Sequence, residues 1–149
     1  MNAVASMISI DTNVCVRILI NDASEPEQSR LARALAKTAG SVFVSQIVQV
    51  ETVWVLESAY GFEKSQVLTV LQAMLANKSW VLQHTDCFVA ALEQFASSNA
   101  GFADCLILAA SQQENLALWT FDRKLGKLQG AQRLTAEMLT ESLNCGVAL

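Results

Sequence analysis

Residues 7–19 read MISIDTNVCVRIL, and this stretch contains the change of local structure that decides the fold. Residues 7–10 form a short run with β-branched side chains, which favours a strand. Asp11 follows directly, and residues 12–19 continue with apolar side chains at helical spacing. A strand, an acid and a helix in immediate succession indicate the opening unit of an α/β fold.

The same alternation of strands and helices continues along the chain. With only one proline and six glycines, the chain is expected to have long elements and short loops. The further predicted elements are strands at residues 42–44, 80–82, 116–121 and 132–134, and helices from Pro26 to Gly40 and at residues 46–60, 63–77, 86–97, 102–113 and 135–144. Ser24 and Ser45 are predicted to cap the helices that follow them. We therefore predict a three-layer α/β sandwich, with helices on both faces of a mostly parallel sheet of about four or five strands.

Two further expectations concern side chains in the core. Ile47, Val50 and Trp54 recur at spacings of three and four, which predicts that they form the buried stripe of their helix. All three tryptophans, Trp54, Trp80 and Trp119, are expected in the core. The four cysteines, Cys15, Cys87, Cys105 and Cys145, have neither C-x-x-C nor metal-ligand spacing, so we expect reduced, buried thiols.

The composition favours one globular domain over residues 1–149. Hydrophobic residues make up 52% of the chain and charged residues 16%, unlike a disordered sequence. The longest apolar runs are about six residues, far short of the roughly 20 that a membrane span needs. No basic residue precedes the first apolar stretch, so a secretion signal is not indicated and a cytoplasmic location is expected. Residues 1–6 are interpreted as a disordered N-terminal extension, with Met7 as a candidate native start.

Four acids lie at the ends of apolar segments or inside them, where a carboxylate is costly unless something pairs with it. They are Asp11, Glu51, Asp104 and Asp122. The other ten acids equal the ten lysines and arginines, so the net charge of −4 corresponds to this set. A bound divalent cation could neutralise much of this negative charge.

The order of the elements predicts that some of these acids meet. Asp11 and Asp122 directly follow predicted strands, and the functional crevice of a parallel α/β sheet lies at the carboxyl ends of its strands. Three or four carboxylates suit Mg²⁺ or Mn²⁺, which can acidify water and stabilise charge on a phosphodiester. Taken singly, Asp11 and Asp104 also fit structural roles as helix caps or dipole partners.

Basic residues follow the last of these acids. Arg123, Lys124, Lys127 and Arg133 occur with no acid among them, and they are candidates for contacts with phosphates. Arg17, on the helix after Asp11, is a weaker candidate for the same role. A solvated surface turn is an equally good explanation for each base taken alone.

Four segments of the sequence resemble the acidic motifs of PIN domains, and more narrowly those of VapC-type toxins of bacterial toxin–antitoxin modules. The segments are ISIDTN at residues 8–13, VETVW at 50–54, FADCLI at 102–107 and TFDR at 120–123. The resemblance runs from about Met7 to Leu134. It implies an Mg²⁺- or Mn²⁺-dependent endoribonuclease that cuts RNA, forms a homodimer and is silenced by a cognate antitoxin that inserts a segment into the site.

The resemblance also implies a role for each site residue. Asp11 and Asp104 would be the principal metal ligands, and Asp122 would complete the shell or bind a second ion. Glu51 would hold or deprotonate the attacking water. Asn13 and Thr120 match polar positions that orient the acids.

Two other functions remain as alternatives. A catalytically silent PIN-like module would bind RNA or a protein without cutting. A small-molecule phosphatase or phosphotransfer domain would use the aspartate after the first strand as nucleophile. That class expects a second aspartate two positions later, where this chain has Asn13.

Overall fold

The structure is a computed structural model, and it describes residues 6–144. The predicted N-terminal extension, except Ser6, and Cys145 lie outside the described residues. The strands are β1 (Met7–Ser9), β2 (Ser41–Val44), β3 (Trp80–Leu82), β4 (Leu118–Thr120) and β5 (Ala131–Arg133). The helices are α1 (Thr12–Leu19), α2 (Pro26–Thr38), α3 (Gln46–Ser58), α4 (Lys64–Ala76), α5 (Thr85–Ser97), α6 (Phe102–Gln113), the 3₁₀ helix η1 (Leu125–Lys127) and α7 (Ala136–Asn144).

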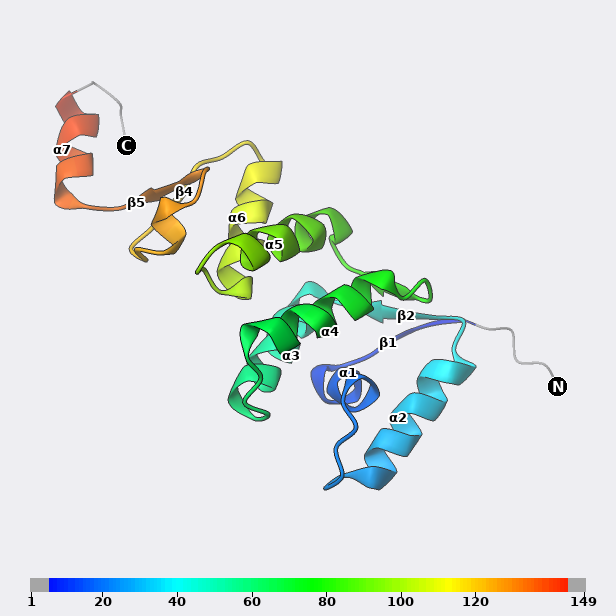
Figure 1. Ribbon diagram of the computed structural model, residues 1–149. Coiled ribbons are helices and arrows are strands. Elements are labelled where there is room, and N and C mark those ends of the chain that lie inside the picture. The colour runs from blue at the N-terminus through cyan, green and yellow to red at the C-terminus, as the bar shows by residue number, and fades with distance from the viewer. Residues whose placement is uncertain (1–5, 145–149) are drawn as a thin grey trace.

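The strands are all parallel, and helices flank them, which confirms the predicted fold class. β1, β2 and β3 form one sheet in that order, with Ile8 opposite Val42 and Phe43 opposite Val81. β4 and β5 form a second parallel sheet. The five expected strands are thus present but divided into three and two. Figure 1 shows β4 and β5 on the far side of α6 from β1 and β2.

Local capping explains where the first helices begin. Ser45 caps α3 by accepting a hydrogen bond from the Val48 backbone N–H at 3.3 Å. The expectation that Ser24 caps α2 is wrong. Both the backbone N–H and the hydroxyl of Ser24 donate to Asp22, and α2 begins after Glu25, which makes no side-chain capping bond.

The main core is a cluster of apolar side chains shared by the three-stranded sheet and helices α1 and α3–α6. Phe102 of α6 makes edge-to-face contacts with Phe88 and Phe95 of α5, at centroid distances of 5.6 and 5.9 Å. A second, smaller cluster on α6 consists of Leu108, Leu125 and Ala131 and supports the two-stranded sheet. α6 is therefore packed on both sides.

The predicted buried stripe of α3 is wrong at two of its three residues, because only Val50 packs against the core, and it is partly buried. Ile47 and Trp54 are 71% and 67% exposed. The helix instead buries the face that carries Val48, Gln49, Thr52, Val53 and Leu56. Nε2 of Gln49 donates to the backbone oxygens of Val44 and Gln83, so a polar side chain ties α3 to the sheet.

The expectations for tryptophan and cysteine are met in part. Trp80 is in the core, whereas Trp54 and Trp119 are exposed. Cys15, Cys87 and Cys105 are buried free thiols, as predicted. Within residues 6–144, no helix combines the length and the apolar character that a membrane span requires.

Leu71 and Leu75 provide a matched test of the core, because they lie one turn apart on α4. Leu71 is fully buried, and Leu75 is 37% exposed. We expect Leu71→Ala to lower the free energy of unfolding by about 2–5 kcal/mol. Leu75→Ala should cost less than half as much, and urea unfolding followed by circular dichroism measures both. Equal losses in the two variants would contradict this packing.

Candidate active site

Asp11 lies at the junction of β1 and α1. Its Oδ1 accepts a hydrogen bond from the Val14 backbone N–H at 3.0 Å, so the side chain caps α1, as the structural alternative proposed. The exposed Asp11 and Asn13 side chains line a groove of about 330 Å³ between α1 and α2. Asp11 is therefore held at a helix N-terminus while its carboxylate remains open to solvent.

Asp104 and Asp122 interact electrostatically. Asp104 lies in the first turn of α6 and is partly buried. Burial raises the pKa of the Asp104 carboxyl, and the negative charge of Asp122 raises that pKa further. A bound cation would offset both of these effects on Asp104.

The turn after β4 fixes the position of Asp122. Its backbone N–H donates to Oγ1 of Thr120 at 3.0 Å, and its Oδ1 accepts from the Leu125 backbone N–H at 2.7 Å, where η1 begins. Oγ1 of Thr120 thus contacts the backbone of Asp122, and Leu125 contacts its carboxylate.

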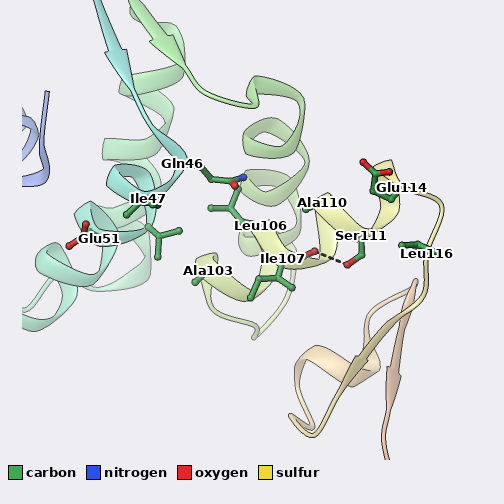
Figure 2. A pocket seen from close by; sticks show the side chains of 11 residues that line it. Gln46, Ile47, Glu51, Ala103, Leu106, Ile107, Ala110, Ser111, Glu114 and Leu116 are labelled. Atoms are coloured by element: carbon green, nitrogen blue, oxygen red, sulfur yellow. Dashed lines mark hydrogen bonds between the residues drawn. The ribbon is translucent and has the colours of Figure 1, made fainter. Parts of the chain in front are cut away.

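Glu51 lies on a different surface. It is exposed on α3 and lines a groove of about 580 Å³ between α3 and α6, which Figure 2 shows from close by. The walls of this groove are mostly apolar and include Ile47, Leu106 and Ile107. Glu51 is consequently the one acid of the four on an apolar groove.

The four acids do not form a single cluster in this arrangement. Within residues 6–144, no three acids, histidines or cysteines are close enough together to hold a metal ion. Asp122 is near enough to Asp104 for its charge to raise the pKa of the Asp104 carboxyl, whereas Asp11 and Glu51 line two separate grooves. The chemistry of the Asp104–Asp122 pair fits a hard cation, but the ligand set is incomplete.

The sequence model of the PIN domain family matches residues 8–131. The chain belongs to the PIN domain family. This match confirms the family that the four acidic segments resemble, and it includes all four acids. It indicates a nuclease-type fold and, in general terms, a hydrolase. No curated protein matches the chain.

Arg17 of this PIN domain is engaged with protein groups. Its guanidinium donates to the hydroxyl of Tyr60 at 2.8 Å, to Asp22 at 3.4 Å and to Gln28 at 3.1 Å. The Tyr60 hydroxyl in turn donates to Asp22 at 2.7 Å. These contacts tie the α1–α2 turn to the end of α3. Asp22 and Tyr60 were not predicted from the sequence, because nothing local links residues 38 positions apart.

The basic residues after Asp122 are exposed. Arg123 and Lys124 lie in the turn after β4, and Lys127 ends η1. Among the ion pairs between residues 6 and 144, none involves these side chains. A Cβ at Gly126 would lie 2.9 Å from the Cβ of Arg133, so η1 packs directly on β5. The PIN domain therefore presents unpaired cations from a closely packed turn beside Asp122.

The apolar groove of the PIN domain was also not predicted. Ile107 and Leu116 are exposed, together with Ile47. A signal was present in α6, where Ile107 is apolar although Phe102, Cys105, Leu106 and Ala109 already fill the buried face. An extra apolar position beyond a complete stripe indicates an exposed apolar surface.

Asp22→Asn tests the network around Arg17. Hydrogen bonds from the hydroxyls of Ser24 and Tyr60 lower the pKa of Asp22 from 3.8 to about 2. Because the folded-state pKa is lowered, charged Asp22 stabilises the fold above pH 3.8, and this contribution is lost as the pH falls through about 2. The difference in unfolding free energy between wild type and Asp22→Asn should shrink over that window, as urea unfolding at a series of pH values measures.

Glu57→Gln, which removes an exposed carboxylate from α3, is the control for a general charge effect. A difference between wild type and Asp22→Asn that stays constant from neutral pH down to pH 2 would contradict the assignment.

Proposed function

We propose that this PIN domain is an Mg²⁺- or Mn²⁺-dependent endoribonuclease of the VapC toxin type. The interaction of Asp104 with Asp122, beside the exposed bases of the following turn, is the observation that carries the proposal. A carboxylate pair attracts a divalent cation, and unpaired bases attract the RNA backbone. Asp122 and the bases follow β4, Asp104 lies in the first turn of α6, and both acids and the bases from Arg123 to Lys127 are within the residues that match the family.

Each side chain is assigned a role that its chemistry permits. Asp104 and Asp122 would hold the metal. Asp11 would be a further ligand once its carboxylate lies close to the same ion. The bound ion would acidify water and offset negative charge at the scissile phosphodiester. Glu51 would hold or deprotonate the attacking water. Arg123, Lys124 and Lys127 would bind the phosphates of the RNA strand, and Asn13 and Thr120 would orient the acids.

The proposal includes a cellular setting. The three buried cysteines are free thiols, which fits a reducing cytoplasm. A toxin of this type would be kept silent by a cognate antitoxin that inserts a segment into the site, and it would act as a homodimer.

A silent PIN-like module that binds RNA or a protein without cutting is the second candidate. The observation that favours it is the lack of a three-ligand metal group between residues 6 and 144. RNA binding by the purified wild type without metal-dependent cleavage would support this second function.

Asp104→Asn should abolish metal-dependent RNA cleavage while leaving the fold intact. The loss should exceed the roughly 10- to 100-fold that removal of an outer partner of a metal ligand costs, because Asp104 is itself assigned as a ligand. Cleavage of a labelled RNA with and without Mg²⁺, and circular dichroism, measure activity and fold. Asp86→Asn, at an exposed acid in the first turn of α5, should retain activity. Full activity in folded Asp104→Asn would refute the metal-ligand assignment.

Lys127→Gln should weaken RNA binding in a salt-dependent way. Removing one lysine that binds a phosphate of a single strand reduces the slope of log K against log salt by about 0.7. Filter binding of catalytically inactive Asp104→Asn, with and without Lys127→Gln, measures that slope. Lys37→Gln, at an exposed lysine of α2, serves as the matched control. Equal slopes for the Lys127 and Lys37 variants would remove Lys127 from the RNA interface.

A further inference from the structure

Lys64 is a partly buried lysine in the first turn of α4. A positive charge is unfavourable at that end of a helix, because the N-terminal end of the helix dipole is itself positive. The ammonium is instead stabilised by a neighbouring helix. Its Nζ donates a hydrogen bond to the backbone oxygen of Ser98, which directly follows α5, and lies 5.0 Å from the centre of the Phe95 ring.

Through this bond, Lys64 holds the loop that leads into α6. Residues 98–101 connect α5 to α6, and Ala100 within the loop is buried. Oγ of Ser98 accepts a hydrogen bond from the Ala100 backbone N–H at 3.3 Å. The bond from the Lys64 ammonium is charge-assisted, and such bonds are stronger than bonds between neutral groups. The loop is therefore tied to α4 as well as to its own residues.

The start of α6 depends on this loop. Gly101 stands at the N-cap position and has no side chain with which to cap the helix, unlike Ser45 before α3. The Cys105 backbone N–H donates to the Gly101 backbone oxygen at 3.0 Å, so the first turn is bonded directly to the end of the loop. Burial raises the pKa of the Cys105 thiol, and the nearby charge of Lys64 opposes that rise. Lys64 thus lies close to the first turn of α6.

Asp104 belongs to the same turn. A Cβ at Gly101 would lie 3.8 Å from Oδ2 of Asp104, so the carboxylate lies against the end of the loop. Movement of the loop would therefore displace this carboxylate.

We propose that Lys64 is a positioning residue for Asp104. Its bond to the Ser98 carbonyl fixes the loop, and the loop fixes the first turn of α6 and the carboxylate on it. The role of that carboxylate as a metal ligand rests on the proposed function, whereas the anchoring of the loop does not.

The stem of Lys64 has a second effect that an experiment has to separate from positioning. Phe95, over which the ammonium lies, packs edge to face on Phe102 in the core. Loss of this packing would weaken the whole fold, whereas loss of the bond to Ser98 would act on the loop. Lys64→Met distinguishes the two effects, because methionine keeps a flexible apolar chain at this position but has no donor and no charge.

Amide hydrogen exchange tests the anchor without reference to activity. In Lys64→Met, amides of residues 98–105 should exchange about 10- to 100-fold faster, which corresponds to the loss of one hydrogen bond to a charged group. Amides of β2 and α3 should keep their wild-type rates. Lys64→Arg restores a charged donor and should restore most of the protection. Lys78→Met, at an exposed lysine between α4 and β3, is the matched control.

Binding of Mn²⁺ to the same proteins, without RNA, tests the connection to Asp104. Removal of a group that orients a metal ligand costs about 10- to 100-fold in metal affinity, and Lys64→Met should weaken Mn²⁺ binding by that factor. Lys64→Arg and Lys78→Met should bind Mn²⁺ nearly as the wild type does. Titration calorimetry with manganese chloride measures the affinities, and circular dichroism verifies the fold. Lys64→Gln takes the place of Lys64→Met if the methionine variant does not fold.

The outcomes separate this inference from the proposed function. Unchanged exchange of residues 98–105 in the folded variant would overturn the anchor, and so would an equal rise in all segments, which reports lost packing. Faster local exchange with unchanged Mn²⁺ affinity would overturn the positioning of Asp104. A wild type that binds no Mn²⁺ would refute the proposed metal site, and the exchange rates would still decide whether Lys64 fixes the loop.

Discussion

The edge-to-face packing of Phe102 against Phe88 and Phe95 fixes α6 on the core, and the placement of both sheets depends on it. The opposite side of α6 carries Leu108, which anchors β4 and β5 through Leu125 and Ala131. A helix buried on two sides acts as a rigid spacer, because close-packed interiors do not deform continuously. The division of the strands into three and two therefore follows from the way one helix distributes its apolar side chains.

The same helix determines the electrostatics of the candidate site. Its first turn holds Asp104 partly buried, where ionisation is penalised, and within reach of the charge of Asp122. A bound cation would remove this penalty on the ionisation of Asp104. Asp11 is placed differently: its carboxylate accepts the Val14 backbone N–H at the N-terminus of α1 and is exposed to solvent.

Local structure was largely predictable from the sequence. The β-branched run before Asp11, the serine before α3 and the apolar spacing of α5 each encode an element within a few residues. The buried face of α3 was not predictable, because Gln49 and Thr52 occupy it while Ile47 and Trp54 give the exposed face a stronger apolar pattern. Burial of Gln49 is favourable only through its bonds to Val44 and Gln83, which are long-range contacts.

In the candidate site, too, local features were predictable from the sequence and long-range contacts were not. The positions of the four acids at element ends were evident from the sequence, and so was the family. Which acids meet depends on how sheet edges pair, and the alternation of strands and helices carries no information about that. The contacts of Arg17 with Asp22 and Tyr60 likewise join residues that no short motif connects.

The close approach of Gly126 to Arg133 has a consequence for the basic turn. Because η1 lies directly on β5, the turn with Arg123, Lys124 and Lys127 moves as one body with the two-stranded sheet. A larger side chain at position 126 would push η1 away from β5 and so alter the direction of the basic turn without touching an acid.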